Sequence, residues 1–497
     1  MRKLLAWLFC AVLLFPLLGL FIHQWDWYAF FSTWFSLNTG IILLDTLKLV
    51  GLVAVFLIVL GLITGLADFF FNPKKKWSFI HLLPLSIPLY LGTFSYGFIQ
   101  GRPAWSSLQF LFPDGGFSLF SLALIFSFLL YPYVYVGVKI SCSGISTSQW
   151  ETLSLYGSIR SKAAFVFQKI APGLFGGVFL ASFEVLNEFG AIKYAGLNTL
   201  TTAIFQEWFS KGNLSGALYL AQILLILAFT LNYLKNKLGS HQESENAVRI
   251  KAPKAFQFLG LGIAHLPLIP GFIIPLVVYI YGIFNSEPDY GELASGIGNS
   301  LMLMGLVVGV ALILGLALSI YLARKKSPVL ESGITLGYTI PGALLAIGFL
   351  GITSILPASV PIYITAPFFC LSYIVFVRLF PVLFHPLQNR SKHVSKSALE
   401  NCEIQGINVF QRLKNYWIPH FSPALIGGAM FLAVDVLKEL PITLILRPFN
   451  FSTLATLSYE YAEDEMLLSS FHFGIWIILV SLITLIVHET VVRKKLK

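Results

Sequence analysis

The sequence predicts an all-α polytopic membrane protein with about 12 transmembrane helices, arranged as two parallel six-helix repeats. Of its 497 residues, 57% are hydrophobic and only 11% are charged, so a soluble fold would expose a largely apolar surface to water. The segment PGLFGGVFLASFEVLNEFG at 172–190 recurs as PALIGGAMFLAVDVLKELP at 423–441. Both copies carry acidic residues in an apolar stretch, which is typical of a transport protein built from two related halves.

Apolar stretches long enough to cross about 30 Å of hydrocarbon occur in both halves. The first half has them near 4–22, 41–66, 79–99, 118–138, 173–196 and 215–235, and the second near 256–284, 297–322, 334–354, 359–384, 424–446 and 470–491. The first stretch is longer than a signal-peptide core and no A-x-A site follows it, so we expect a retained span. Span boundaries are least defined where prolines interrupt the pattern, at Pro84, Pro88, Pro361 and Pro367.

Basic residues indicate the orientation of the spans. They follow the second, sixth and eighth spans and end the chain: Lys74, Lys75, Lys76, Lys235, Lys237, Arg249, Lys251, Lys254, Arg324, Lys325, Lys326, Arg493, Lys494, Lys495 and Lys497. All lie on one side if both termini are cytoplasmic. The polar stretch 239–255 then links a first half, 1–238, to a second half, 256–497, on that side. Because six spans return the chain to its starting side, the halves share one orientation.

A long cytoplasmic loop precedes the repeated helix in each half, at 139–172 and 385–423. The sequence SALENCEIQGINVFQRLKNYWI at 397–418 predicts a short helix, a turn at Gly406 and a second helix. The first loop has the same pattern around Gly157. A membrane-hugging hairpin can be inert packing, but two in matching places favour a docking surface for a symmetric cytoplasmic partner.

The second loop resembles the EAA loop, E-A-A-x3-G-x9-I-x-L-P, of type I ABC importer permeases, which work with a periplasmic binding protein. The matching positions are Glu400, Gly406, Tyr416, Ile418 and Pro419, with Asn401 and Cys402 in place of the alanines. The resemblance implies a MetI-like permease fold. It also implies that this loop is a coupling helix, which inserts into a cleft on the ATPase subunit and transmits its closure.

The first loop departs further from this motif. Glu151 and Gly157 keep the spacing, but no proline equivalent to Pro419 follows. Gly157 lies 15 positions before Pro172, whereas Gly406 lies 17 before Pro423, so the first loop is two residues shorter (17 − 15 = 2). We hypothesise that the first half couples less tightly to its ATPase.

Two further segments resemble ferric-iron importer permeases: NEFGAIKYAGLNTLTTAIFQEWF at 187–209 and KELPITLILRPFNFSTLAT at 438–456. The resemblance covers essentially the whole chain, including the fusion of two permease halves. It implies a permease of the bacterial inner membrane that moves iron(III), delivered by a periplasmic binding protein, into the cytoplasm by alternating access. ATP and Mg would bind a separate ATPase subunit, expected in two copies. Fused permeases for thiamine and for aminoethylphosphonate remain alternatives, because substrate varies within one fold.

Charged residues of the repeated helix are candidates for the path or for helix packing. Asp435, Lys438 and Glu439 have i, i+3, i+4 spacing, and Glu184 and Glu188 have i, i+4 spacing, so each set is predicted to share a helical face. In a membrane such groups face the bundle interior or a water-filled path. They are either a buried pair with Lys438 that fixes packing, or carboxylates that suit a hard cation such as Fe³⁺.

Arg447 and four histidines are weaker candidates for functional residues. Arg447, near the outer end, is expected to contact the binding protein or an accompanying anion, or only to anchor its helix. We expect no high-affinity metal site, because His81, His265, His385 and His420 lack ligand spacing and are taken as loop or interfacial residues.

No Walker motif occurs, so the chain is expected to be no enzyme and to bind no cofactor itself. The formal charge of +10 lies beside the spans, and we therefore expect membrane lipid rather than nucleic acid as a partner. An ion-driven secondary transporter is the alternative from another class, but it would have no ATPase for the two hairpins to dock on.

Overall fold

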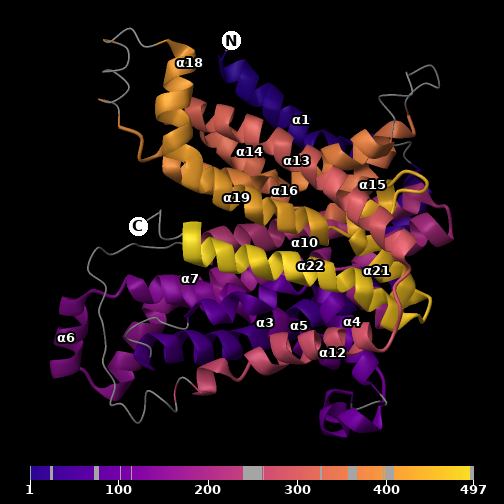
Figure 1. Ribbon diagram of the computed structural model, residues 1–497, viewed down its shortest axis with the longest axis horizontal. Coiled ribbons are helices and arrows are strands. Elements are labelled where there is room, and N and C mark those ends of the chain that lie inside the picture. The colour runs from indigo at the N-terminus through magenta and orange to yellow at the C-terminus, as the bar shows by residue number, and fades with distance from the viewer. Residues whose placement is uncertain are drawn as a thin grey trace. The chain divides into compact units, whose positions relative to one another are not determined.

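The computed structural model describes residues 2–22, 26–71, 78–100, 102–112, 115–238, 260, 262–324, 327–355, 367–395, 397, 404 and 408–492. Within these ranges the chain folds into helices and contains no β-strand (Figure 1). The same ranges hold nine helices long and apolar enough to cross a membrane, or up to 12 if each bent pair is one span. The prediction of an all-α polytopic membrane protein is confirmed.

The helices of the first half correspond in order to those of the second. Up to residue 238 they are α1 (Arg2–Ile22), α2 (Trp27–Trp34), α3 (Leu37–Phe71), η1 (Ser78–Ser86), α4 (Leu89–Ile99), η2 (Pro103–Leu111), α5 (Leu119–Ser143), α6 (Thr147–Tyr156), α7 (Ile159–Asn187), α8 (Gly190–Tyr194), α9 (Leu200–Phe205), η3 (Gln206–Ser210) and α10 (Leu214–Leu238). Beyond residue 260 they are η4 (Ile269–Ile273), α12 (Ile274–Phe284), α13 (Tyr290–Arg324), α14 (Pro328–Thr339), α15 (Gly342–Thr353), α16 (Pro367–Ser391), α18 (Val409–Arg412), η5 (Leu413–Trp417), α19 (Ile418–Lys438), α20 (Pro441–Leu446), α21 (Leu454–Glu463), α22 (Leu467–Val487) and η6 (His488–Val492). Helices α3 and α13 both have 35 residues, and α5 and α16 both have 25.

Two of the predicted spans are broken rather than continuous. The stretch at 79–99 consists of η1 and α4, which meet at 81°, and the stretch at 334–354 consists of α14 and α15, which meet at 103°. Pro88 and Pro341 cap the second member of each pair with nearly the same backbone angles, φ −56°, ψ 151° and φ −55°, ψ 138°. Proline lacks an N–H and disfavours helical geometry in the residue before it, so a continuous helix ends at these positions.

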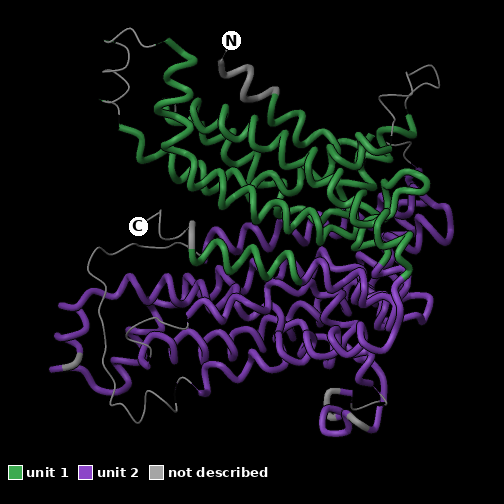
Figure 2. The backbone as a smooth tube through the Cα atoms, in the orientation of Figure 1, with its two compact units in different colours: residues 1–25, 289–457, 479–497 green, residues 26–288, 458–478 purple. Residues whose placement is uncertain are grey.

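The helices form two compact units that divide the chain differently from the predicted halves (Figure 2). Unit 1 contains residues 1–25, 289–457 and 479–497, and unit 2 contains residues 26–288 and 458–478. The opening helix of each half thus belongs to the unit that is otherwise built mainly from the other half. The predicted linker, 239–255, lies outside the described residues, and the predicted boundaries of the halves remain a prediction.

Specific contacts attach these two opening helices within their units. In unit 1, α1 packs against α14 and α15, and the Tyr373 hydroxyl of α16 donates a hydrogen bond to the Val12 carbonyl. In unit 2, α12 packs against α4. There the Tyr279 hydroxyl donates to the Leu91 carbonyl at 3.2 Å and the Tyr96 hydroxyl donates to the Pro270 carbonyl at 2.7 Å.

Glycine allows the central helices of unit 2 to approach at backbone distance. A Cβ at Gly173 of α7 would lie 2.0 Å from the Gly137 carbonyl oxygen of α5, and one at Gly177 would lie 2.6 Å from the Tyr133 carbonyl oxygen. Small residues at helix contacts are the usual way in which membrane helices pack closely. The repeated helix α7 is therefore held tightly against α5, beside the Tyr133 side chain.

Candidate functional site

Both repeated helices end at a glutamate that caps the short helix that follows. The Glu188 carboxylate accepts a hydrogen bond from the Ala191 N–H at 2.9 Å, and the Glu439 carboxylate accepts one from the Ile442 N–H at 3.1 Å. In each case the donor lies three residues beyond the glutamate, near the start of α8 or α20. The first N–H groups of a helix lack partners within it and carry partial positive charge, so a carboxylate there is stabilising.

The two glutamates stand at the C-terminal ends of the repeated helices. Helices α7 and α19 end at Asn187 and Lys438, and the glutamate after each has φ −74°, ψ 124° for Glu188 and φ −67°, ψ 114° for Glu439. Because φ remains near its helical value and only ψ is extended, each glutamate keeps its place at the end of the helix while the chain after it turns away. Glu184 and Asp435 remain inside their helices and are half-buried.

Glu439 also has a partner that was not anticipated from the sequence. Arg378 of α16 forms an ion pair and hydrogen bond with it, and the two side chains belong to residues only 7% and 4% exposed. The sequence-based alternative considered Lys438 as the partner. Arg378 is the one charged residue in the apolar stretch 359–384, and that isolation was the signal that could have identified it.

Hydroxyl groups fix the helix after each break at matched positions. The Leu200 N–H donates to the Thr46 hydroxyl, and the Leu454 N–H donates to the Ser300 hydroxyl, both at 2.9 Å. The N–H of the residue before each leucine donates to a threonine hydroxyl three residues on, Thr202 or Thr456, both at 2.8 Å. The contact of Leu200 with Thr46 joins α9 to α3, and that of Leu454 with Ser300 joins α21 to α13. Sequence analysis missed these four positions.

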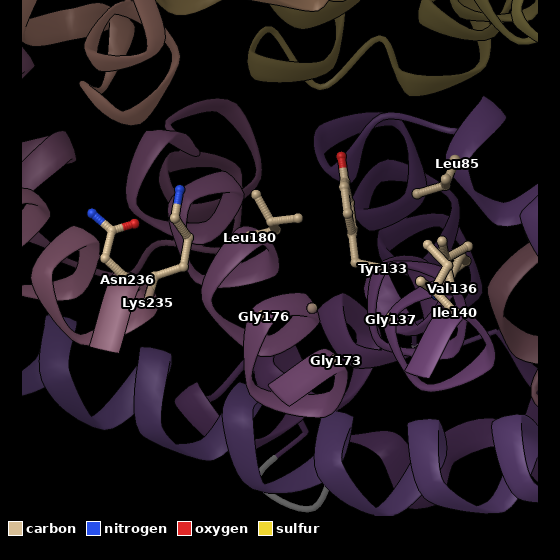
Figure 3. Close-up of a pocket in the computed structure, with 12 residues that line it drawn as sticks. Leu85, Tyr133, Val136, Gly137, Ile140, Gly173, Gly176, Leu180, Lys235 and Asn236 are labelled. Atoms are coloured by element: carbon tan, nitrogen blue, oxygen red, sulfur yellow. The ribbon is translucent and has the colours of Figure 1, made fainter. Parts of the chain in front are cut away.

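A cavity of about 690 Å³ opens in unit 2 between α5, α7 and α10 (Figure 3). Its lining residues are Leu85, Pro132, Tyr133, Val136, Gly137, Ile140, Gly173, Gly176, Gly177, Leu180, Lys235 and Asn236. Figure 3 shows Tyr133 on one side of the cavity and Lys235 on the other, with Leu180 and Gly176 between them. The Tyr133 hydroxyl donates to the Glu184 carboxylate at 3.3 Å, which links the predicted acidic residue to this cavity.

The first of the two long loops, at 139–172, has the helical hairpin that its sequence predicts. Helix α6 ends before Gly157, which is extended at φ −88°, ψ 134°, and α7 begins after Ser158, whose hydroxyl accepts a hydrogen bond from the Ser161 N–H at 3.2 Å. Glu151 lies on α6 and is exposed. At the hairpin, Ile159 is 88% exposed, so the turn presents apolar surface to an environment outside this chain.

The second loop is described in part. Glu400 and Gly406 lie outside the described residues, whereas Ile418 and Pro419 form the first residues of α19. Asn408 caps α18 as Ser158 caps α7, and its side chain accepts a hydrogen bond from the Gln411 N–H at 2.8 Å. Phe410, two residues beyond this cap, is 79% exposed.

The structure also shows where part of the length difference between the loops lies. In the first loop, the capping residue Ser158 lies 14 positions before Pro172 (172 − 158). In the second loop, the capping residue Asn408 lies 15 positions before the equivalent proline, Pro423 (423 − 408). The second helix contains a π-helical segment, η5, over Leu413–Trp417, and α7 has none. A π turn holds one residue more than an α turn, so η5 accommodates one of the two extra residues.

Arg447 and the histidines have packing contacts. The Arg447 guanidinium donates to the Ser452 hydroxyl at 3.2 Å. His81 is fully buried, which contradicts its assignment as a loop or interfacial residue. Its ring lies 4.4 Å from that of Tyr135, whose hydroxyl donates to the Asp68 carboxylate at 3.0 Å. No group of three or more His, Cys, Asp or Glu residues positioned to hold a metal ion occurs in the part of the chain that the structure describes.

Comparison with known proteins identifies a relative. The chain is 22% identical to the Fe(3+)-transport system permease protein FbpB 2 of Haemophilus influenzae over 420 residues, which cover 80% of this chain and 79% of that protein. No family model matches the sequence. The similarity extends over most of both chains, as the sequence resemblance predicted.

Proposed function

We propose that the chain is a multi-pass permease of an iron importer and that it carries iron(III) itself across the bacterial inner membrane, on the basis of its similarity to an iron ABC permease and of its apolar helices. The family implies ATPase and binding-protein partners in general. We propose in addition two ATPase copies, one for each cytoplasmic hairpin, and cytoplasmic termini. The observation that carries the proposal is the pair of matched helix starts at Ser158 and Asn408, each beside exposed apolar residues and each leading into a repeated helix.

The exposed apolar residues are suited to an ATPase cleft. Ile159 and Leu155 project from the first hairpin, and Val409 and Phe410 from the second. Burial of one such side chain contributes about 1.5–3 kcal/mol, so a few of them are enough to hold a hairpin in a complementary cleft. Separate ATPase subunits would supply ATP hydrolysis, and the permease itself would perform no enzymatic step.

Helix α7 connects this docking point to the membrane interior. Its 29 residues span about 43 Å at about 1.5 Å per residue, from Ile159 to the break at Glu188. The cavity residues Gly173, Gly176 and Leu180 lie on the same helix. A displacement of the hairpin by ATPase closure would therefore move the cavity floor directly, which supports alternating access.

The charges divide into two proposed roles. Glu188 and Glu439 stabilise the helix breaks through their N–H contacts, and Arg378 neutralises Glu439. Glu184 and Asp435 lie inside the repeated helices and are half-buried, and we propose that they face the path, where carboxylate oxygens suit a hard cation. A few carboxylates without a closed metal site would allow iron to leave quickly.

Uptake by the reconstituted complex tests the proposal. Vesicles would contain the chain, its ATPase and its binding protein, and uptake of Fe³⁺, thiamine and aminoethylphosphonate would be compared with and without internal ATP. We expect ATP-dependent Fe³⁺ uptake that survives collapse of ion gradients. Thiamine or aminoethylphosphonate uptake without Fe³⁺ uptake would overturn the iron assignment, and uptake that needs an ion gradient but no ATP would support a secondary transporter.

A further inference from the structure

Among the described residues that line the cavity in unit 2, the one charged side chain is the cation Lys235. Lys235 of α10 lies at one side, and the remaining polar groups are the Asn236 amide and the Tyr133 hydroxyl, which donates to the Glu184 carboxylate at 3.3 Å. The other lining residues are apolar or glycine. A bare metal cation would meet repulsion at Lys235, so this lining suits a different ligand from the cation proposed as cargo.

Lys235 has no carboxylate counter-ion among the described residues. Other basic side chains are paired, for example Lys139 with Asp68, Lys211 with Glu207 and Arg378 with Glu439. The Lys235 ammonium lies 5.6 Å from the centroid of the Phe183 ring, and the residue is half-buried. A cation partly removed from water is costly unless it is paired, and this arrangement favours an anion that is supplied from outside the chain.

The second half closes the corresponding place with aromatic rings. Lys235 and His488 both lie 21 residues after the start of their helices (235 − 214 and 488 − 467), and Leu180 and Phe431 both lie eight residues after the shared proline (180 − 172 and 431 − 423). Phe431 and His488 pack with ring centroids 4.8 Å apart. Two aromatic rings therefore occupy positions in the second half that correspond to Leu180 and Lys235, and the cation is found in the first half.

We propose that this cavity binds an anionic oxygen group, a carboxylate or a phosphate, with the Lys235 ammonium as counter-ion. The Asn236 amide can donate a hydrogen bond to the same group, and Val136, Ile140 and Leu180 contact an apolar remainder (Figure 3). Two sources have this chemistry: a soluble anion that enters with the cargo, and the headgroup of an anionic lipid. The site goes beyond the iron assignment and does not depend on it.

Binding to the purified full chain in an uncharged detergent tests the site. The soluble probes are citrate and inorganic phosphate, measured by calorimetry. The lipid probe is phosphatidylglycerol against phosphatidylcholine in nanodiscs, measured by native mass spectrometry. We expect at least one anionic probe to bind, and Lys235→Met to weaken that binding at least about tenfold, or about 1.4 kcal/mol.

Matched variants distinguish the loss of the Lys235 charge from misfolding of the chain. Lys237→Met removes an exposed ammonium two residues along the same helix and is expected to leave binding unchanged, whereas Lys235→Arg keeps the charge and most of the affinity. Gly176→Leu fills the cavity and should abolish binding without altering Lys235. Unfolding midpoints of all variants identify any that are misfolded.

The outcomes assign the source or overturn the site. Lys235-dependent binding of citrate or phosphate supports a soluble anion, and Lys235-dependent enrichment of phosphatidylglycerol supports a lipid headgroup. Absence of binding to every probe, or equal binding by Lys235→Met and Lys237→Met, overturns the proposal. No ATPase or iron is present in these measurements, so a failure of iron uptake and a failure of anion binding remain distinguishable.

Discussion

Replacement of Arg378 by methionine is expected to destabilise the protein strongly. Methionine keeps much of the length and apolar contact of the side chain but removes the partner of Glu439. Both residues are almost fully buried, at 7% and 4% exposure. Breaking a buried pair by removal of one partner costs about 3–5 kcal/mol, because it leaves an uncompensated charge.

The assay is reversible unfolding in lipid nanodiscs, followed by a dye that reacts with cysteine thiols. Cys10, Cys142 and Cys370 are buried, so each becomes reactive only when its surroundings open, and a Cys402→Ser background confines the signal to these three. Lys211→Met is the matched control, since its ion pair with Glu207 lies outside the predicted spans and has a lysine side chain 55% exposed, and such pairs contribute about 0–1 kcal/mol.

The double variant distinguishes packing from a role in the path. Arg378→Met with Glu439→Gln removes both charges, and the glutamine oxygen can still accept from the Ile442 N–H, so most of the lost stability should return. A single-variant loss below about 1 kcal/mol, or a double variant no more stable than the single, would refute this reasoning. A double variant with restored stability but no iron uptake would instead place the pair in the path.

Three further predictions concern the repeated contacts and the hairpins. Thr46→Val and Ser300→Ala should each leave a buried N–H unpaired at a cost of about 1–3 kcal/mol, with faster amide exchange at Leu200 and Leu454; unchanged exchange would contradict the contacts. Ile159→Asp should reduce copurification of the ATPase without lowering the unfolding midpoint, and retention of the ATPase would argue against docking at this residue. Gly157→Pro, which removes the N–H bonded to the Leu153 carbonyl, should impair ATP-driven uptake less than Gly406→Pro, and equal losses would contradict unequal coupling.

Hydropathy was sufficient to locate most of the spans because the membrane imposes a length requirement on each segment separately. The predicted stretch 118–138 corresponds to α5 (Leu119–Ser143), and 215–235 corresponds to α10 (Leu214–Leu238). Pro88 was identified as an interruption of its span, whereas the break before Pro341 was not evident, since the residues on both sides of it are apolar. The hairpin at Gly157 was predictable because a glycine between two amphipathic segments is a local signal.

The site was less predictable because its contacts join residues far apart in the chain. Spacing placed Glu188 near the face of Glu184, but it did not reveal that the Glu188 carboxylate caps the next helix. The charge of Arg378 in an apolar span indicated a buried partner without specifying which one. The length difference between the loops was evident, but its accommodation by a π-helical segment depends on hydrogen bonds that spacing does not reveal.

The sequence by itself determined that this is a multi-pass helical membrane protein with a repeated acidic helix after each of two long loops. It did so because composition, apolar length and turn residues act locally. Only the tertiary structure decided that Glu188 and Glu439 cap the next helices, that Arg378 neutralises Glu439, and that Lys235 lines a cavity in the first half. These features depend on how closely the helices approach one another. The approach is set by contacts between residues far apart in the chain, such as Thr46 and Leu200, which are more than a hundred positions apart.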